Sequence, residues 1–440
     1  MAATTTTTGM RAFFTVWAGQ LVSVVGTSLT GFGLQVWVFL ETGSVTQLAL
    51  VSLAFGLPSV LLAPVAGALV DRWDRRLTMF GADLAAGLAT GAIALLHFSG
   101  SLEVWHIYLL VGVGALANGF QQPAWMASLP LLVPKRHLGR ANGLVQTSDA
   151  LGLVIAPAAA GAMLATLGLG AVLLADVATF LVAVVTLSMV RFPRPEQAPE
   201  SRGGSIREDI RLGWRYLRER TGLLWLLGTA AGVNFTLSFT NVLIIPLIVS
   251  FSNEAAAGTV LSVAGIGMLA GSVAVGAWGG PKQRVRGMML GIVAVGGFVI
   301  LTGLRPSALL IGVAGFCLMA VVPIVNTTSQ VLWQLKVPPA LQGRVFALRR
   351  MISQAMSPIA ILAAGPLADR VFEPLMADDG ALAPTVGSIL GTGAGRGIAL
   401  LTVLSGIGVI VMGLAGWAHP RVRHLETDLP DQIAEEPATA

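Results

Sequence analysis

Apolar runs of membrane-spanning length, each followed by a short polar segment, recur along the whole chain. An uncharged run of about 18 or more apolar residues is long enough to cross a bilayer as a helix. The pattern predicts an all-α polytopic membrane protein with twelve transmembrane helices. We expect these spans at 12–40, 45–70, 77–98, 103–129, 139–166, 169–190, 223–251, 256–280, 287–304, 307–334, 342–371 and 395–418.

The longest polar stretch inside the chain divides the spans into two sets of six. Its sequence RFPRPEQAPESRGG is rich in proline and charge, which is typical of a linker. The next residues, SIREDIRLGWRYLRER, place apolar side chains on one helical face and arginines on another, as in a helix that lies on a membrane surface. We therefore expect four parts: an N-terminal six-helix bundle (1–191), a cytoplasmic linker with an interfacial helix (192–222), a C-terminal six-helix bundle (223–420) and a disordered cytoplasmic tail (421–440).

Basic residues are distributed unevenly between the two sides of the predicted membrane protein. If the N-terminus is cytoplasmic, all of the 27 Lys and Arg residues except Arg305, Arg370 and Arg396 fall on the cytoplasmic side. This is the positive-inside pattern. It predicts a multi-pass protein of the plasma membrane, the inner membrane in a bacterium, with both termini in the cytoplasm. It also accounts for the net charge of +5 without a nucleic-acid partner.

A charged cluster directly follows the second predicted span. Its sequence, GALVDRWDRR, resembles the signature G-x-x-x-D-R-x-x-R-R after the second helix of major facilitator transporters. A carboxylate at this place can cap a neighbouring helix and pair with arginine, so we interpret the cluster as a latch of the inner gate. The alternative is that its arginines only anchor the topology. The matching residues are Gly67, Asp71, Arg72, Arg75 and Arg76.

Further segments extend the resemblance over most of the chain. VPKRHLGRA and VPPALQGRV, which begin at Val133 and Val337, share V-P-x-x-x-x-G-R and indicate an internal repeat. With GTSLTGFGLQVWVFLETGS and QGRVFALRRMISQAMSPIAILAAGPLADRVFEPLM, they resemble the macrolide-efflux and enterobactin-exporter branch of the major facilitator superfamily. The resemblance implies the major facilitator fold, in which two six-helix bundles rock about a central site.

The fifth span carries a run of small residues. In SDALGLVIAPAAAG, Gly152, Pro157 and Gly161 match the exporter pattern G-x-x-x-G-P-x-x-G-G. Small residues allow close helix packing and proline permits a bend, so we expect these three to be packing residues. The resemblance implies export, with ordinary small-residue packing as the alternative.

Acidic residues inside apolar spans are candidate functional groups. Asp149 lies near the middle of the fifth span and is our candidate for a proton or cationic-substrate site. The competing interpretation is a structural acid that is hydrogen-bonded to a neighbouring helix. For Asp83 and Asp176, which lie nearer the ends of their spans, we favour the structural interpretation.

Amides and aromatic residues of the central spans are candidates for a substrate cavity. In the major facilitator architecture, the first, fourth, seventh and tenth helices surround the substrate path. A mostly apolar pocket with scattered amides suits a bulky amphiphilic compound. The candidate cavity residues are Gln20, Gln35, Asn118, Gln122, Trp125, Asn234, Asn241 and Asn326.

The sequence favours a secondary active transporter that exports an amphipathic small molecule, a macrolide-like drug or a siderophore-like metabolite, by proton antiport. A metabolite or lipid importer, or a flippase of the same fold, is the alternative. A membrane-embedded enzyme is disfavoured because the five histidines form no metal motif, and G-x-x-x-x-G-K-[ST] is absent from the sequence. A receptor is also disfavoured. We expect no cofactor and no metal site, and as partners only substrate, protons and membrane lipid around a monomer.

Overall fold

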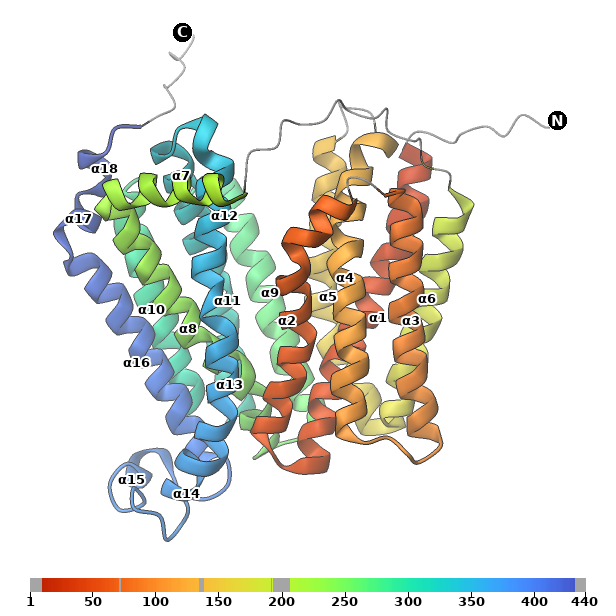
Figure 1. Ribbon diagram of the computed structural model, residues 1–440. Helices are drawn as coiled ribbons and strands as arrows, with labels where there is room; N and C mark the ends of the chain where they lie inside the picture. The colour runs from red at the N-terminus through yellow and green to blue at the C-terminus, as the bar shows by residue number, and fades with distance from the viewer. Residues whose placement is uncertain (1–9, 71–72, 134–137, 191, 193–205, 432–440) are drawn as a thin grey trace. The chain divides into compact units, whose positions relative to one another are not determined.

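The computed structural model is all-helical in the residues that it describes, which are 10–70, 73–133, 138–190, 192 and 206–431 (Figure 1). A helix lies at each of the twelve predicted spans. Ten helices of the described residues are long and apolar enough to cross a membrane. The all-α membrane fold that the apolar pattern predicts is therefore confirmed.

The chain divides into two compact units. The first comprises residues 1–199 with 248–262, and the second comprises 200–247 with 263–440. Helix α9 (Glu254–Trp278) thus contributes its first turns to the first unit. The boundaries that the sequence suggests for two six-helix bundles stay a prediction.

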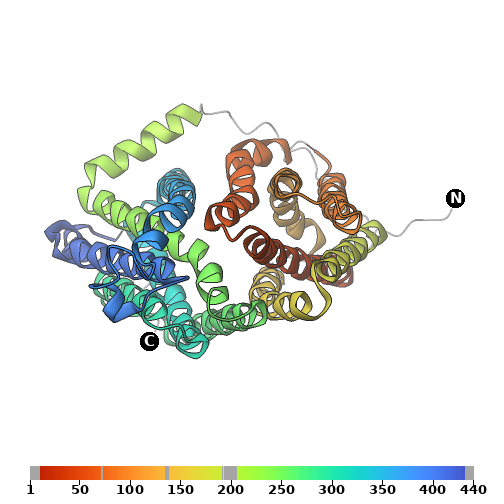
Figure 2. The same cartoon turned by 90° about the horizontal axis from the view of Figure 1, so that it is seen from below.

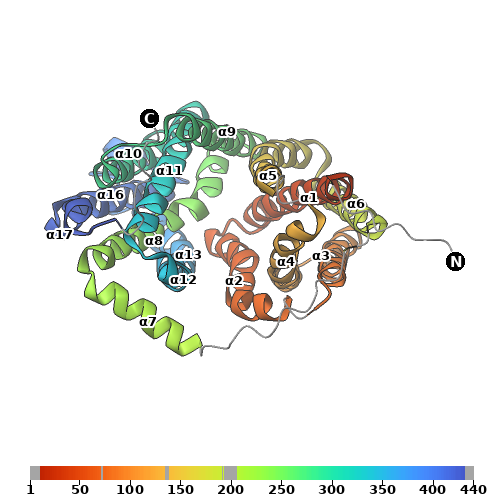
Figure 3. The ribbon, with the colours of Figure 1, turned by 90° about the horizontal axis from the view of Figure 1, so that it is seen from above.

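The first unit is a bundle around α1. Its helices are α1 (Met10–Thr42), α2 (Val45–Val70), α3 (Arg75–Phe98), α4 (Val104–Leu132), α5 (Leu138–Leu167) and α6 (Leu169–Met189). Two turns use glycines with positive φ, Gly43 (62°) between α1 and α2 and Gly168 (76°) between α5 and α6. The end-on views place α1 between α4 and α5, so α1 faces the interior of this unit along its length (Figures 2 and 3).

Close contacts between helices of the first unit depend on small residues. A Cβ on Gly26 of α1 would lie 2.8 Å from a carboxylate oxygen of Asp176 on α6. The missing side chain therefore lets α1 and α6 approach each other closely. Two clusters of buried apolar side chains form the core of the bundle. One includes Phe13, Met79 and Leu129, and the other includes Leu34, Ile107 and Leu173.

The second unit packs around α10 (Arg284–Leu304) and α16 (Arg396–Ala418), which lie side by side (Figure 3). Its other long helices are α8 (Thr221–Val249) and α11 (Ala308–Lys336). The predicted eleventh span is interrupted: it consists of α12 (Pro339–Ala355), α13 (Ser357–Leu367) and a π-helical turn, η2 (Ala368–Phe372). Pro358 and Pro366 lack the N–H that a continuous helix needs, which explains the interruption.

The loop before α16 is ordered by a helix cap. It contains the short helices α14 (Glu373–Leu375) and α15 (Gly387–Leu390). The Glu373 carboxylate accepts hydrogen bonds from the backbone N–H groups of Gly395 (3.2 Å) and Ile398 (3.0 Å) at the start of α16. A carboxylate satisfies unpaired N–H groups at a helix N-terminus and opposes the helix dipole, so it fixes where α16 begins.

Helix α7 (Ile206–Glu219) lies where the sequence predicts an amphipathic helix. Leu217 is fully buried, whereas Arg215 and Glu219 are exposed. The Tyr216 hydroxyl donates a hydrogen bond of 2.7 Å to the Lys336 carbonyl at the end of α11. Figure 1 shows α7 running crosswise to the long helices of its unit. Residues 193–205 of the predicted linker lie outside the described residues.

The C-terminal segment packs against the second unit as far as residue 431. It forms α17 (Pro420–Arg423) and α18 (Leu425–Asp428), and it buries Val422 and Leu425. The Glu426 carboxylate accepts hydrogen bonds from the backbone N–H groups of Arg284 (3.1 Å) and Val285 (3.2 Å). Part of the tail that the sequence predicts to be disordered is thus helical in this structure, and 432–440 lie outside the described residues.

Candidate substrate cavity

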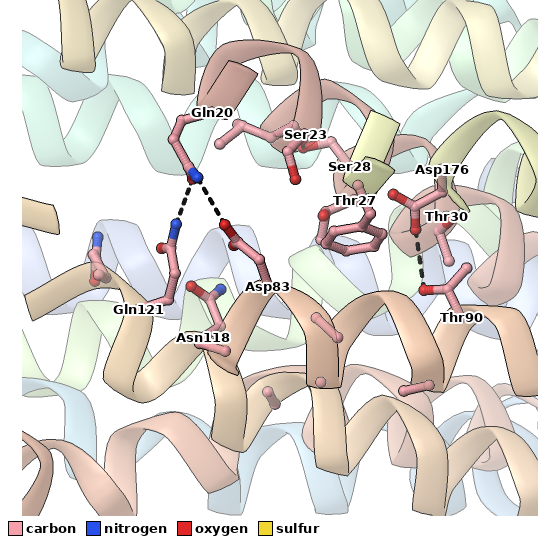
Figure 4. A pocket seen from close by; sticks show the side chains of 18 of the residues that line it. Gln20, Ser23, Thr27, Ser28, Thr30, Asp83, Thr90, Asn118, Gln121 and Asp176 are labelled. Atoms are coloured by element: carbon pink, nitrogen blue, oxygen red, sulfur yellow. Dashed lines mark hydrogen bonds between the residues drawn. The ribbon is translucent and has the colours of Figure 1, made fainter. Parts of the chain in front are cut away.

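A cavity of about 410 Å³ lies inside the first unit (Figure 4). Residues from all six helices of the bundle line it. Along α1, α3, α4 and α6, the polar lining residues fall between the two apolar clusters, whereas the lining residues Ile93, Val111 and Trp125 belong to these clusters. The cavity therefore gathers polar side chains in a layer between two packed apolar layers.

A chain of three polar side chains crosses one part of the cavity. Asp83 on α3 is only 4% exposed, and its carboxylate accepts a hydrogen bond of 2.9 Å from the Gln20 amide on α1. The Gln121 amide on α4 in turn donates to the side-chain oxygen of Gln20. Figure 4 shows this arrangement. The network ties three helices together at the cavity wall.

A second buried carboxylate lines another part of the cavity, away from Asp83 (Figure 4). Asp176 on α6 is 1% exposed. It accepts a hydrogen bond of 3.2 Å from the Thr90 hydroxyl on α3, and the Thr179 hydroxyl lies 3.4 Å from its other oxygen. Among the described residues, neither lysine, arginine nor histidine lines the cavity. A buried carboxylate without a basic partner is costly as an anion, so both acids need neutralisation by a proton or another cation.

Aromatic side chains form rigid parts of the wall. The Trp17 indole N–H donates a hydrogen bond of 3.0 Å to the Leu144 carbonyl on α5. Trp125 stacks on Phe13, with ring centroids 6.1 Å apart and an interplanar angle of 5°. Phe55 and Phe180 also line the cavity. Fixed aromatic faces beside amides suit a compound with apolar and polar parts.

The structure brings some of the predicted cavity residues together. Gln20, Asn118, Gln122 and Trp125 all line the cavity. Gln35, by contrast, donates to the Gly31 carbonyl of its own helix and accepts from the Ser52 hydroxyl.

The remaining three predicted cavity residues belong to the second unit. The Asn234 amide on α8 donates a hydrogen bond of 3.0 Å to the Ser353 carbonyl on α12. Asn241 lies on α8 and Asn326 on α11. A role of these residues in substrate binding stays a prediction.

The predicted gate cluster is described only in part. Asp71 and Arg72 lie outside the described residues, and Gly67 lies in α2. Arg75 begins α3, and Arg76 donates to the carbonyl groups of Leu187 (3.3 Å) and Ser188 (2.8 Å) at the end of α6. A cation at this helix C-terminus is favourable, so Arg76 holds α3 and α6 together.

Asp74, an acid that the sequence interpretation did not use, is the N-cap residue directly before α3. Its carboxylate accepts a hydrogen bond of 3.1 Å from the Leu77 backbone N–H. Asp immediately before a helical run is a standard N-cap signal, so this role could have been found from the sequence.

The small residues of α5 lie at two helix contacts. A Cβ on Gly152 would lie 3.0 Å from the Ser28 hydroxyl on α1, and one on Gly161 would lie 2.6 Å from the Glu254 carbonyl at the start of α9. Pro157 lies inside α5, and the next N–H group, that of Ala158, bonds to the Ser262 hydroxyl (3.0 Å). These contacts agree with a packing role for the three motif residues. The Asp149 side chain lies outside the described residues.

The structure gives Asp83 and Asp176 more prominence than the sequence interpretation did. Both line the cavity, whereas we favoured a purely structural role from their distance to the span centres. The usable signal was the rarity of acids within apolar spans, which marks each of them as a functional candidate irrespective of depth.

Comparison with known proteins identifies the family of the chain. A family model described as Major Facilitator Superfamily matches residues 16–361 of this chain. Macrolide efflux protein A of Streptococcus pyogenes is 29% identical over 364 residues, which cover 82% of this chain and 90% of that protein. Multidrug efflux pump Tap of Mycolicibacterium fortuitum is 25% identical over 378 residues, which cover 80% of this chain and 90% of the pump.

Solved structures share the fold at lower sequence identity. A bacterial homologue of the human lysosomal transporter Spinster, in an inward-facing and unoccupied conformation, has a TM-score of 0.66 at 15% identity, covering 92% of this chain and 95% of that one. The nucleoside transporter NupG has a TM-score of 0.67 at 14% identity, covering 93% and 100%. These findings confirm the resemblance drawn from the sequence motifs. The chain therefore belongs to the Major Facilitator Superfamily, a family of multi-pass membrane transporters for small molecules rather than of enzymes.

Proposed function

We propose that this transporter exports an amphipathic small molecule, a macrolide-like drug or a siderophore-like metabolite, in exchange for protons. The observation that carries the proposal is the buried Asp83 carboxylate, which lies at the wall of a polar cavity without a basic side chain among its described lining residues. The relatives named macrolide efflux protein A and multidrug efflux pump support the direction of transport.

The chemistry of the cavity supports an amphipathic substrate. Trp17, Trp125 and Phe180 offer flat apolar surfaces, and Asn118, Gln121 and Gln122 offer amide donors and acceptors. Such a lining can bind a compound through burial of apolar area and still orient its polar groups. It also tolerates differently shaped compounds, because aromatic stacking demands less exact geometry than a charge pair.

Proton exchange follows from the two forms of a buried carboxyl group. As an anion, Asp83 attracts a cationic or hydrogen-bond-donating substrate; when it is protonated, that attraction disappears. Proton uptake from the outer side would therefore favour substrate release there. Asp149 on α5 remains a second candidate carrier, because an acid inside an apolar span is a functional candidate.

The proposed cycle is alternating access by a monomer in the plasma membrane, with both termini in the cytoplasm. Gly67, Asp71, Arg72, Arg75 and Arg76 would latch the cytoplasmic gate, and the surrounding lipid would contact the exposed apolar side chains. Rocking of two bundles about a central site is the established mode of movement for this architecture.

Transport into everted vesicles tests the proposal directly. An imposed pH gradient, acidic inside, should drive accumulation of a substrate chosen from a panel of macrolides, catechol siderophores and lipophilic cations. Asp83→Asn should abolish the pH-driven component, whereas Glu41→Gln, at an exposed acid of α1, should retain it. Accumulation that needs the opposite gradient would instead identify an importer, and gradient-independent accumulation would contradict proton coupling.

A further inference from the structure

Three threonine hydroxyls surround the carboxylate of Asp176 deep in the first unit. They come from different helices: Thr30 from α1, Thr90 from α3 and Thr179 from α6, the helix of Asp176 itself. Figure 4 shows Thr30, Thr90 and Asp176 side by side at one end of the cavity. We refer to these four residues as the threonine–aspartate cluster.

One hydroxyl of the cluster lacks a hydrogen-bond partner. Thr30 is 5% exposed and lies against the Asp176 carboxylate, but its Oγ1 makes no bond of acceptable geometry within the described residues. An unpaired buried hydroxyl costs free energy, and native proteins rarely keep one without a reason. The Thr30 oxygen is therefore available to a ligand bound beside the carboxylate.

No basic side chain lies beside the cluster to balance its charge in the part of the chain that the structure describes. The basic residues of the helices that pack against it lie toward the helix ends: Arg11 on α1, and Arg75, Arg76 and His97 on α3. His97 is seven residues from Thr90, or roughly 10 Å along a helix. The acids on these helices are Glu41 at the end of α1 and Asp83, two turns from Thr90. A cation would satisfy both the Asp176 charge and the Thr30 hydroxyl.

We propose that the threonine–aspartate cluster binds a dehydrated sodium ion. Its five side-chain oxygens, two from the carboxylate and three from hydroxyls, are hard ligands that suit an alkali or alkaline-earth cation and not a transition metal. The single carboxylate matches a single positive charge. The Thr179 hydroxyl already donates to the Asp176 carbonyl (2.7 Å), which leaves its lone pairs free to face an ion.

A proton is the competing occupant, and the number of converging oxygens argues against it. Protonated Asp176 would donate one hydrogen bond and would need only one acceptor, such as Thr30. It would not need hydroxyls from three helices around one carboxylate. At Gly26, where a Cβ would lie 2.8 Å from Asp176 Oδ1, α1 also approaches the carboxylate closely, one helical turn before Thr30.

Sodium binding can be measured on the purified full chain without a substrate. The melting temperature is followed by tryptophan fluorescence in choline chloride, with stepwise replacement by NaCl, LiCl or KCl at constant ionic strength and pH. Sodium should raise the melting temperature in a saturable manner, because a ligand that binds only the folded state stabilises it. Potassium, which is larger, should raise it less.

Variants assign the effect to the cluster. Thr30→Val should weaken sodium binding at least about tenfold, because loss of even an outer-shell partner typically costs about 10–100-fold in affinity at metal sites, and Asp176→Asn should abolish it. In choline chloride, Thr30→Val should be as stable as the unaltered protein or more so, because it removes an unpaired buried hydroxyl. The matched control is Thr186→Val on α6, the helix of Asp176, because the Thr186 hydroxyl bonds to the Ala183 carbonyl; this variant should keep the full sodium response.

Three results would overturn the proposal. One is an equal melting temperature in sodium and choline for the unaltered protein. Another is an undiminished sodium response in both Thr30→Val and Asp176→Asn. The third is stabilisation by acid alone, which would identify a protonated Asp176. None of these results depends on transport, so failure of the proposed export function and failure of this site are distinguishable.

Discussion

The side-chain amide of Gln20 donates a hydrogen bond of 2.9 Å to the carboxylate of Asp83. This bond joins α1 to α3 inside the cavity, and Gln121 extends it to α4. Both partners are about 95% buried, so neither can exchange its partner for bulk water. A hydrogen bond in the wall of the candidate substrate cavity thus also holds the bundle together.

Replacement of Gln20 by leucine should destabilise the first unit. The change leaves the Asp83 carboxylate buried without its donor, at an expected cost of about 1–3 kcal/mol in the free energy of unfolding. Combining it with Asp83→Leu should recover part of this loss, because both polar groups are then absent. Unfolding in detergent measures each variant, and a double-mutant cycle gives the coupling.

Gln122→Leu is the control for that cycle, because Gln122 lines the same cavity but is exposed. Its effect should stay within about 0.5 kcal/mol. Equal costs for the Gln20 and Gln122 variants would show that the bond to Asp83 contributes nothing of its own.

Alanine at Gly258 should disrupt the contact between α5 and α9. An added Cβ would lie 2.9 Å from the Pro157 carbonyl carbon, which is backbone and cannot rotate away. We expect a loss of about 1–3 kcal/mol, as for other overpacked sites. Gly276→Ala on the same helix has open space around its Cβ and should be neutral or slightly stabilising, since alanine favours helices. Thermal unfolding compares the two, and similar melting temperatures would contradict a tight contact.

Most of the fold could be predicted because membrane helices follow from local composition. Twelve apolar runs predict the positions of twelve helical spans, and the charge cluster at 67–76 with the motifs of α5 indicates the family from sequence alone. The interruption of the eleventh span was missed, although Pro358 and Pro366 mark it. A lipid environment leaves the backbone few alternatives to a helix, so such predictions need little tertiary information.

The arrangement of the cavity could not be predicted to the same degree. Four of the amide and aromatic candidates line the cavity, but Gln35 does not. Its side-chain amide donates instead to the Gly31 carbonyl, four residues earlier in the same helix, and a polar side chain on any helix can make such a bond. For Asp83 and Asp176, the sequence interpretation favoured a structural role because of their depth along a span. Their positions depend instead on which helix face each occupies relative to neighbours, and one sequence does not carry that information.

Lys336→Met should loosen the C-terminal segment without unfolding the second unit. Lys336 is 4% exposed, and its ammonium group pairs with the Asp431 carboxylate at 2.9 Å and donates to the Glu426 carbonyl at 3.0 Å. The Asp431 carboxylate that stays behind is 48% exposed and can be hydrated, so no buried charge is left unpaired and we expect a change below about 1 kcal/mol in global stability. The bonds from Lys336 to the Glu426 carbonyl and to the Asp431 carboxylate are lost, however, so hydrogen exchange in 420–431 should accelerate.

Hydrogen–deuterium exchange with peptide resolution measures this local effect. Lys282→Met, at an exposed lysine just before the start of α10, is the control and should leave exchange in 420–431 unchanged. If both variants exchange alike, Lys336 does not anchor the segment.

The last prediction concerns alkaline pH and Tyr216. Burial raises the pKa of the Tyr216 phenol, while the Arg220 guanidinium, 3.8 Å above its ring, acts more weakly in the opposite direction. A group whose pKa is higher in the folded state stabilises the fold below its unfolded pKa, near 10 for tyrosine, and loses that contribution as the pH rises further. The free energy of unfolding of the unaltered protein should therefore exceed that of Tyr216→Phe by about 1 kcal/mol near neutral pH, because of the hydrogen bond to the Lys336 carbonyl. This difference should disappear above about pH 10.

Since the chain has two tyrosines, Tyr108→Phe leaves Tyr216 as the single phenol, and its ionisation can be followed by ultraviolet absorbance. The titration midpoint should lie above that of free tyrosine and fall to it on unfolding. A stability difference between the unaltered protein and Tyr216→Phe that is constant from neutral to alkaline pH would contradict the buried bond, because an exposed phenol would titrate alike in both states and leave the difference independent of pH.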